Sequence, residues 1–509
     1  MLDEPYICGI HRFTHWVGRV GKGDMTVNFW AAARFPRQFS DTAPSATDSD
    51  PQGVRSIYQQ DYDRLLFSTP VRRLADKTQV WPMEENDGVR TRLTHSHEVA
   101  NLARSIGARA YTRAEEYFSG ANFGTVIQPI LQAIGLAHDL GNPPFGHQGE
   151  TAIGDWFKVR KDWIFTKEDQ KSDADLEDPV PKNLWEEFTE FDGNPQTLRL
   201  LVNLQTHQAR VGLDLTAATL SAVLKYPVHV TNREQSGVNT RAQAKKGGYF
   251  ESEFHVVEWL RKETGLREGQ RHPLTWIMEA CDDIAYSVLD VDDLLKKSVL
   301  SPDDVLVTLR HSSCVKEDPA VTKLVNKFRE VNNGDRHVEI QRDIKIQYLR
   351  AYMIEALINE ASDEFVKNVG LIMKLKQITA LMENSSLCNA LKGIAKQYGL
   401  RHPKVLLAEA TGAAAIDGLM TALWNAISKR KEKDDLRSKR ITARDRYIFS
   451  LISPNYIEQA ETSSQRSRQA NNLRYRELRL LTDMVSGMTD TFAINLWRSI
   501  REVPDVDCT

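Results

Sequence analysis

Apolar positions along this chain recur mainly at intervals of three and four residues, the period of helices that bury one face. The clearest run spans 89–118, where Val99, Leu102 and Ile106 fall on one side of a helix. Similar patterns cover 151–160, 198–224, 253–263, 274–297 and the chain from 319 to its end. We find no internal repeat and no convincing series of alternating apolar and polar residues. The pattern therefore predicts a mainly α fold.

Two stretches depart from this period. Residues 40–52 are rich in Ser, Thr, Asp and Pro, so we expect 1–50 to be an N-terminal extension and linker. Met25 is an alternative start, in which case the native protein would lack the first 24 residues. Residues 161–190 are acidic and broken by Pro179 and Pro181, which predicts a surface excursion.

Composition narrows the class of protein. Of the 509 residues, 41% are apolar and 27% charged, and the net charge of -3 predicts no overall attraction to nucleic acid. The five cysteines are scattered without a CxxC pair, which argues against a thiolate zinc site and fits a reducing cytoplasm. We find no signal peptide. The uncharged run 119–137 contains Asn122, Gln128 and Gln132, so a buried core helix is favoured over a membrane span.

The most informative stretch is 136–150, where an apolar helical pattern runs into the adjacent pair His138 and Asp139. Two glycines and two prolines then force a tight, stiff loop. The loop delivers His147 and Glu150, an imidazole and a carboxylate three residues apart. Candidate metal ligands beside such a pair suggest a metal-dependent hydrolase.

Two further ligands follow from helical periodicity. His95 shares a helix face with Val99 and Leu102 and so points inward, although a satisfied core histidine is the alternative. Asp282 aligns with the apolar side of its helix, where a carboxylate is costly unless it is paired or bound to a metal. Asp283 lies on a more polar side, so we expect it at the surface or behind the ligands.

A mixed imidazole and carboxylate set is formed by His95, His138, Asp139 and Asp282. Such a set suits a divalent ion such as Mg, Mn, Fe, Co or Zn, and it leaves coordination positions for water and phosphate. The sequence therefore predicts a divalent metal cofactor.

Several motifs resemble those of one enzyme family. The order His, His-Asp, Asp is similar to that of the HD phosphohydrolase superfamily, and five segments resemble the bacterial dGTP triphosphohydrolases. These segments are Asp76-Lys-Thr-Gln79-Val, Val89-Arg-Thr-Arg-Leu-Thr-His95-Ser, His138-Asp-Leu-Gly-Asn-Pro-Pro-Phe-Gly-His147-Gln-Gly-Glu150, Leu224-Lys225-Tyr226 and Ser486-Gly-Met-Thr-Asp490. The match runs from about Pro51 to the C-terminus and is strongest between Arg64 and Asp290.

The resemblance carries expectations for fold, reaction and partners. It implies a helical HD core over 51–300 and an additional helical region over 301–509. It implies hydrolysis of dGTP to deoxyguanosine and triphosphate in control of the dNTP pool, with Mg as the ion and Mn or Co as alternatives. It also implies a homo-oligomer, commonly a hexamer. From the cysteines and the uncharged run above, we expect a cytoplasmic protein that does not span a membrane.

Two catalytic roles are implied by the same resemblance. His147 would protonate the departing 5′ oxygen, and Glu150 would orient it. An ordinary residue at a helix N-terminus, after a proline-rich loop, is the alternative for His147.

Seven substrate-binding residues are implied by the resemblance, and they are Gln79, Asn194, Lys225, Tyr226, Lys246, Tyr286 and Asp290. Lys225, with Tyr226 beside it, and Lys246 would bind phosphates, and the other four would lie near the deoxyribose, where a snug wall rejects a 2′-hydroxyl. Lys246 matches less closely, because Gly247 stands where the family has proline, and a surface lysine is the alternative. The alternatives for Tyr286 and Asp290 are a core aromatic and an exposed carboxylate.

The C-terminal third carries a local excess of positive charge. The segment 428–446 holds nine Lys or Arg against four acidic residues. Five arginines follow with Tyr475 among them, namely Arg466, Arg468, Arg474, Arg476 and Arg479. By resemblance, a basic surface here would bind single-stranded DNA, whereas a helix face with internal salt bridges is the alternative.

Other functions remain open at this point. One is a triphosphohydrolase with broad dNTP specificity, and another is an HD enzyme that acts on monophosphates or ppGpp. The matches at Gln79 and at Lys225 with Tyr226 argue against monophosphates. A third is a DNA-binding regulatory protein with an idle HD site, which the intact ligand set and the pair of His147 and Glu150 argue against.

Overall fold

Helices dominate the part of the chain that the structure describes. The computed structural model describes residues 27–36, 55–81, 88–233, 244–399, 401–462 and 471–504. Within these ranges the only β structure is a few isolated bridges, such as that between Thr78 and Thr91. The prediction of a mainly α fold is therefore confirmed. The alternative start at Met25, together with Arg466 and Arg468, lies outside the described residues.

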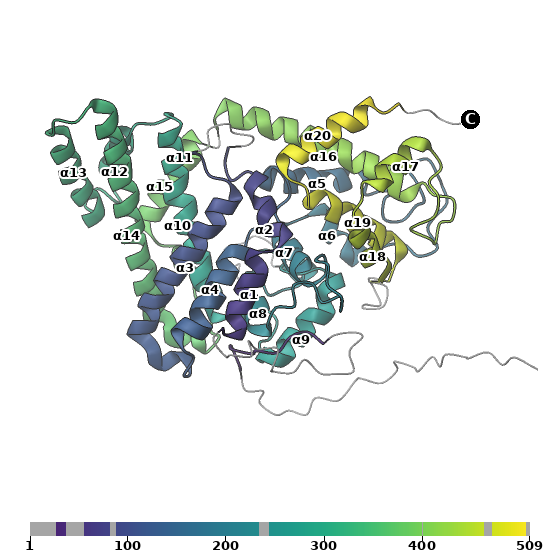
Figure 1. The fold of residues 1–509 in the computed structure, drawn as a ribbon, viewed down its shortest axis with the longest axis horizontal. Helices are drawn as coiled ribbons and strands as arrows, with labels where there is room; N and C mark the ends of the chain where they lie inside the picture. Colours follow the sequence, from purple (N-terminus) through teal and green to yellow (C-terminus); the bar gives the residue numbers. More distant parts are fainter. Residues whose placement is uncertain are drawn as a thin grey trace, which may run out of the picture.

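The central part of the molecule is built from the first half of the chain (Figure 1). Its α-helices are α1 (Ile57–Leu66), α2 (Thr69–Arg73), α3 (Arg92–Ala114), α4 (Gln128–Ala137), α5 (Gly146–Arg160), α6 (Glu186–Thr189), α7 (Gly193–Val202), α8 (Ala217–Val223), α9 (Phe254–Thr264), α10 (Pro273–Ile284) and α11 (Asp290–Lys296). Short 3-10 segments are η1 (Leu74–Asp76), η2 (Glu115–Phe118), η4 (Lys182–Leu184), η5 (Val230–Asn232) and η7 (Glu251–Glu253). Two π-helical turns are η3 (Phe123–Ile127) and η8 (Ala285–Leu289).

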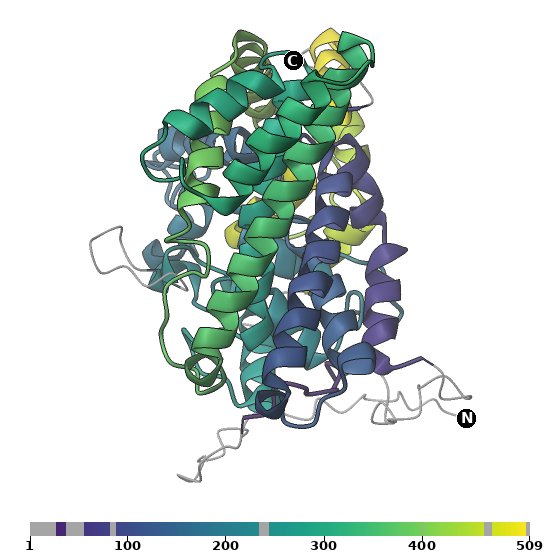
Figure 2. The same ribbon diagram turned by 90° about the vertical axis from the view of Figure 1, so that its left-hand side faces the viewer.

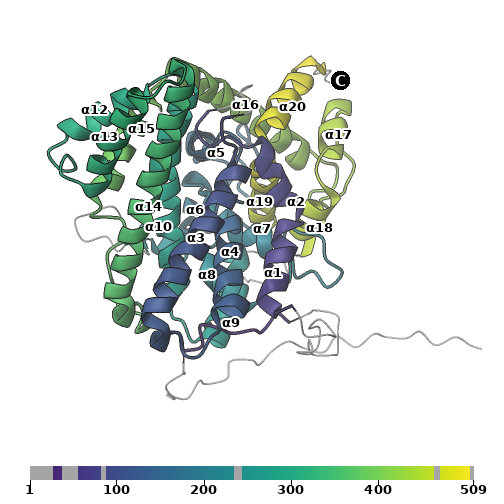
Figure 3. The same cartoon turned by 60° about the vertical axis from the view of Figure 1, so that its left-hand side comes forward.

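A second group of helices lies along one side of this centre (Figures 1 and 3). It comprises α12 (Pro302–His311), α13 (Pro319–Asn332), α14 (Val338–Met373) and α15 (Ser386–Tyr398). Helix α14 has 36 residues and packs against α3, α10 and α13. Figure 2 shows it running beside α3.

A third group lies on the opposite side, with its first helix running across the top of the view (Figures 1 and 3). It comprises α16 (Pro403–Ser428), α17 (Ala443–Ser450), α18 (Pro454–Thr462), α19 (Leu473–Ser486) and α20 (Asp490–Glu502). Helix α16 is long and apolar enough to cross a membrane by length and composition alone. It packs against α5, α17, α19 and α20, as the core helix of a folded domain does. One cluster of buried apolar side chains includes members of all three groups.

The single helix expected over 198–224 is wrong. Helix α7 ends at Val202 and α8 begins only at Ala217. The intervening loop holds Arg210, Gly212 and Asp214 at positive φ, which a helix does not allow. A Cβ on Gly212 would lie 2.2 Å from the carbonyl oxygen of residue 201, so the loop packs closely against the end of α7. Residues 203–210 are mostly polar, and Val211, Leu213 and Leu215 alternate, so the helical period lapses in this loop.

The surface excursion expected over 161–190 is also wrong in part. Phe165, Leu184 and Phe188 are fully buried within it, and the rings of Phe165 and Trp185 stack at 4.8 Å. Even Glu187 is fully buried, because it accepts hydrogen bonds from Tyr475 and Arg479 of α19. The charged residues that suggested a surface loop surround an aromatic core.

Candidate metal centre and active site

The two histidines predicted as ligands are brought together by the close packing of α3 and α4. His95 lies in the first turn of α3, and His138 directly follows α4. Gly135 permits the approach, because a Cβ there would lie 2.6 Å from the Cα of Ala100. The ring centroids of His95 and His138 are 5.3 Å apart, and both side chains are buried.

Two carboxylates lie against these imidazoles. Asp282, near the end of α10, has its Oδ1 3.4 Å from His95 Nε2 and 3.5 Å from His138 Nε2. Asp139 has its Oδ1 3.6 Å from His138 Nε2 and its Oδ2 3.9 Å from His95 Nε2. The structure thus brings the four predicted ligands into one cluster, contributed by α3, by the end of α4 and by α10.

The donor atoms of this cluster fit a divalent ion. His95 Nε2 and His138 Nε2 are buried without a hydrogen-bond partner, which is costly for a nitrogen that nothing else binds. His138 Nδ1 lies 2.7 Å from the carbonyl oxygen of Gly135, and when Nδ1 donates there the Nε2 lone pair is free for a metal. One ligand atom each from His95, His138 and Asp139 lies within 4.8 Å of the others. These residues could therefore hold a metal ion.

Each of the two carboxylates in the cluster is paired with a cation. Arg92 donates to Asp139, and Lys225 Nζ lies 3.2 Å from Asp282 Oδ2. Burial alone would lower the pKa of His138, but the carboxylates of Asp139 and Asp282 raise it to about 9. Burial lowers the pKa of His95 and so favours the neutral imidazole that can bind a metal.

The loop between Asp139 and α5 sets the position of His147. Phe145 and Gly146 have φ angles of 62° and 57°, so the chain turns sharply into α5. Helix α5 begins at Gly146, earlier than the predicted start at 151, and places His147 in its first turn. His147 Nδ1 lies 2.8 Å from Glu150 Oε2. This hydrogen bond raises the pKa of His147.

Glu150 is held from a second direction. Its Oε1 accepts a hydrogen bond of 2.8 Å from the backbone N–H of Gly193 at the start of α7. Gly193 is tightly enclosed, since a Cβ there would lie 3.0 Å from Glu150 Oε1 and 2.6 Å from Asn142 Oδ1. The carboxylate that contacts His147 is therefore fixed by two elements.

The two lysines predicted to bind phosphates are both partly buried and paired with carboxylates. Lys225 Nζ contacts Asp282, and Lys246 Nζ lies 2.5 Å from Asp192 Oδ2. Lys246 lines a cleft of about 220 Å³ together with Glu150 and Asp192. Lys246 is therefore not the isolated surface lysine that was the alternative. Tyr226 follows Lys225 and is buried.

The residues predicted near the deoxyribose have distinct surroundings. Gln79 Oε1 is buried and has no hydrogen-bond partner. Tyr286 lies in the π turn η8, a feature that often occurs at functional sites. Asp290 is buried and lies 2.6 Å from Arg90 Nη2, so it is not an exposed carboxylate. Burial raises the pKa of Asp290 to about 7 despite the nearby Arg90. Asn194 donates to Asp192 through its side chain and its backbone.

Three residues of this region were not predicted. Arg92 holds Asp139, Arg90 holds Asp290, and Asp192 holds Lys246. Helical spacing could have indicated Arg92, which shares the buried side of α3 with Ser96 and Val99. The pairing of Asp192 with Lys246 has no comparable signal in the sequence, because it joins distant segments.

Several arginines of the basic C-terminal region are buried inside the protein. Arg430, Arg440, Arg474 and Arg479 are all buried. Arg474 lies 3.1 Å from Glu477, Arg479 pairs with Glu187, and Arg440 donates to backbone carbonyls. For these arginines the structure has the internal pairing that was the alternative to a DNA-binding surface.

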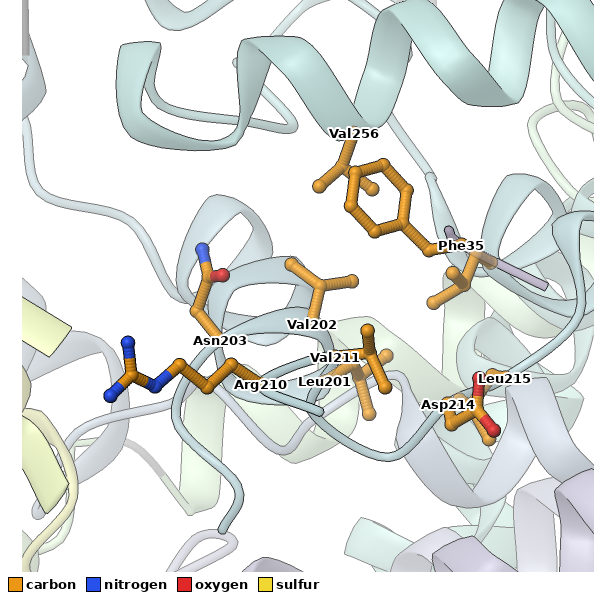
Figure 4. Close-up of a pocket in the computed structure, with 10 residues that line it drawn as sticks. Phe35, Leu201, Val202, Asn203, Arg210, Val211, Asp214, Leu215 and Val256 are labelled. Atoms are coloured by element: carbon orange, nitrogen blue, oxygen red, sulfur yellow. The ribbon is translucent and has the colours of Figure 1, made fainter. Parts of the chain in front are cut away.

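Figure 4 shows another hollow, lined by Phe35, Val202, Arg210, Val211 and Asp214 among others. Its volume of about 10 Å³ leaves room for about one water molecule. Its lining includes none of the predicted site residues. This hollow is therefore not a candidate substrate site.

Comparison with known proteins places the chain in a family. No family model matches it. A protein of Listeria monocytogenes named deoxyguanosinetriphosphate triphosphohydrolase-like protein is 33% identical over 463 residues, which cover 89% of this chain and 96% of that protein. The deoxyguanosinetriphosphate triphosphohydrolase of Salmonella typhimurium is 32% identical over 496 residues, with the same shares covered. The family predicted from the motifs is thus confirmed, and the chain is an enzyme of the deoxyguanosinetriphosphate triphosphohydrolase family of hydrolases.

Proposed function

We propose that this enzyme uses a divalent metal ion to hydrolyse dGTP to deoxyguanosine and triphosphate. The observation that carries the proposal is the position of two unpartnered buried nitrogens, His95 Nε2 and His138 Nε2, against one oxygen of Asp282. The fixed pair of His147 and Glu150 at the start of α5 adds an acid–base group. The names of the relatives support dGTP as the substrate.

The metal would be held by His95, His138, Asp139 and Asp282. When bound, such an ion neutralises charge on the α-phosphate and lowers the pKa of a water molecule that it binds. Lys225 contacts Oδ2 of Asp282, whose Oδ1 faces the imidazoles, and Arg92 donates to Oδ2 of Asp139, so each carboxylate is held in place by a cation. We propose Mg as the ion by resemblance, with Mn and Co as alternatives, since the two imidazoles of the set also suit transition metals.

His147 acts as the general acid. The oxygen of water forms a bond to the α-phosphorus while the bond from that phosphorus to the 5′ oxygen breaks. The protonated imidazole of His147 gives its proton to the 5′ oxygen, which yields deoxyguanosine and leaves the triphosphate intact. Glu150 raises the pKa of His147 through its hydrogen bond and so favours the protonated imidazole.

The remaining predicted residues would bind the substrate. Lys225, Tyr226 and Lys246 would contact the phosphates, and the two lysines would then share their charge between phosphate and Asp282 or Asp192. The sugar would lie against the residues predicted for it, namely Gln79, Asn194, Tyr286 and Asp290. The unpartnered oxygen of Gln79 can accept a hydrogen bond from a sugar hydroxyl.

A panel of the four dNTPs with Mg, Mn or Co tests the proposal. We expect dGTP to be consumed fastest and turnover to stop when a chelator removes the metal. Similar rates for all four dNTPs would favour the broad-specificity alternative. No turnover of any dNTP with any of these metals would overturn the proposal and favour a protein with an idle HD site.

We also propose a cytoplasmic homo-oligomer, a hexamer by resemblance, that controls the dNTP pool. The division into a linker over 1–50, an HD core over 51–300 and a helical region over 301–509 is part of the same proposal. Sedimentation velocity of the full chain tests the hexamer, and a monomer at working concentrations would contradict it.

Single-stranded DNA is a further proposed ligand. The exposed cations that support it are Lys429, Lys431, Lys433, Lys439 and Arg446. Binding that weakens steeply as salt is added would support a phosphate-binding surface, and binding that is absent or independent of salt would reject it.

A further inference from the structure

The motif Ser486-Gly-Met-Thr-Asp490 joins α19 to α20, and its last residue contacts the loop between Asp139 and α5. Asp490 is buried, and its Oδ1 accepts a hydrogen bond of 3.0 Å from the backbone N–H of Phe145. Its Oδ2 accepts hydrogen bonds from the backbone N–H of Thr78, at 3.1 Å, and from the Thr78 hydroxyl. One carboxylate thus joins three segments that are far apart in the sequence.

The contact with Phe145 acts where the chain turns toward His147. Phe145 has a φ of 62°, a left-handed conformation that a bulky residue rarely adopts without support. Its N–H is held by Asp490, and its ring packs against α16. The ring is so close that a Cβ on Gly412 would lie 2.5 Å from it. Both the backbone N–H and the ring of Phe145 are therefore held in place, immediately before the first turn of α5.

The neighbouring contacts reach the other side of the site. Lys77 is buried and donates from Nζ to the carbonyl oxygens of Asn142 and Ser486, the latter at 2.9 Å. Asn142 in turn donates to Asp139 Oδ1 at 2.6 Å. The turn between α19 and α20 is therefore connected to both ends of the loop that runs from Asp139 to His147.

We propose that Asp490 is a positioning residue for His147. By fixing the N–H of Phe145 in its left-handed conformation, Asp490 sets the direction in which α5 begins and so the place of the His147 imidazole. The C-terminal turn is thus part of the active site, although none of its side chains is a predicted ligand or catalytic group. The inference rests on the proposed function, in which His147 is the general acid.

The first test replaces Asp490 with Asn in the full chain. We expect kcat to fall by about 10- to 100-fold with KM changed by less than about threefold, because a displaced acid slows the chemical step. Mn²⁺ affinity, measured by calorimetry, should stay within about threefold of wild type. Asp445→Asn is the matched control. Asp445 is also buried in the first turn of a C-terminal helix, but its carboxylate accepts a hydrogen bond from Thr442, the N-cap of that same helix.

A double-mutant cycle separates positioning from general stability. When His147→Ala has already removed the acid, Asp490→Asn should lower the residual rate by less than about twofold, because the two changes remove the same contribution. A full additional loss of rate in the His147→Ala background would overturn the proposal.

A second variant tests the same idea without touching a polar group. Gly412→Ala presses on the Phe145 ring from α16 and should lower kcat by about 10-fold or more while Mn²⁺ still binds. Gly393→Ala in α15 is its control, because a Cβ there meets nothing within 4 Å. Wild-type kcat in both Gly412→Ala and Asp490→Asn, measured with an active wild-type enzyme, would overturn the inference and leave the proposed function standing.

Discussion

His147 Nδ1 lies 2.8 Å from Glu150 Oε2, and the second oxygen of the same carboxylate accepts the backbone N–H of Gly193 at 2.8 Å. Glu150 therefore connects the first turn of α5 to the start of α7 through two hydrogen bonds. The imidazole itself is largely exposed, with 80% of its side-chain surface accessible, whereas Glu150 is buried. A fixed carboxylate thus carries an imidazole that can reach a substrate from the open side.

The pH profile of Glu150→Gln tests the role of this carboxylate. Glu150 raises the pKa of His147, and the proposed acid is active only while protonated, so activity falls as pH rises through that pKa. Removing the charge lowers the pKa, and we expect the basic limb of kcat/KM to move to lower pH. Asp155→Asn on the exposed side of α5 should leave the limb in place. An unchanged limb in Glu150→Gln would show that another group controls it.

Substitution of a proposed metal ligand should weaken metal binding. His95→Asn and Asp282→Asn should each weaken Mn²⁺ binding by about 100-fold or more and lower kcat/KM accordingly, since each removes a donor from a set of four. His311→Asn is a control, because that imidazole is exposed on α12 and bonds to the carbonyl of Val307. Calorimetric titration with Mn²⁺ gives the affinity directly. Unchanged binding in both site variants would show that the metal binds at another site.

Lys225 is predicted to act on the phosphates as well as on Asp282. Lys225→Met should lower kcat/KM by about 100-fold, because the variant leaves a partly buried carboxylate and the substrate phosphates without their cation. Inhibition by free tripolyphosphate should weaken, whereas inhibition by deoxyguanosine should not. Lys323→Met on α13 is the control, since its ammonium pairs with Glu355 at the surface. Equal inhibition by tripolyphosphate in wild type and Lys225→Met would remove Lys225 from the phosphate site.

The raised pKa of Asp290 should make the free energy of unfolding depend on pH. Its pKa is about 7 in the folded chain and about 3.9 in an unfolded one, so the folded state binds more protons between these values. The free energy of unfolding should then fall as pH rises from about 4 to about 7, and Asp290→Asn should remove that part of the fall. Urea unfolding at about pH 5 and about pH 7.5 measures this difference, with the exposed Asp363→Asn as control. A difference between wild type and Asp290→Asn that does not change with pH would contradict the shift.

The sequence was most informative about side-chain orientation within a single helix. Helical spacing separated Asp282, which faces the two imidazoles, from Asp283, whose Oδ1 lies 2.6 Å from Lys392 of α15. The same spacing placed His95 inward, and it could have done so for Arg92.

Helical spacing could not predict contacts between segments that are distant in the sequence. The hydrogen bonds from Phe145 to Asp490 and from Gly193 to Glu150 depend on how helices pack, which local periodicity does not encode. The loop between α7 and α8 interrupts the helical period at the polar residues 203–210, so the sequence did carry a signal for it. The π turn at Tyr286 was hidden, since one π turn hardly alters the spacing on either side.

Hydrolysis of dGTP in ¹⁸O-labelled water, followed by ³¹P NMR and mass spectrometry of the products, tests the central claim most directly. If water attacks the α-phosphorus and His147 protonates the 5′ oxygen, the label enters one terminal phosphate of intact triphosphate and deoxyguanosine carries none. Release of pyrophosphate or orthophosphate as the first product, or label in the 5′ oxygen of deoxyguanosine, would contradict this account.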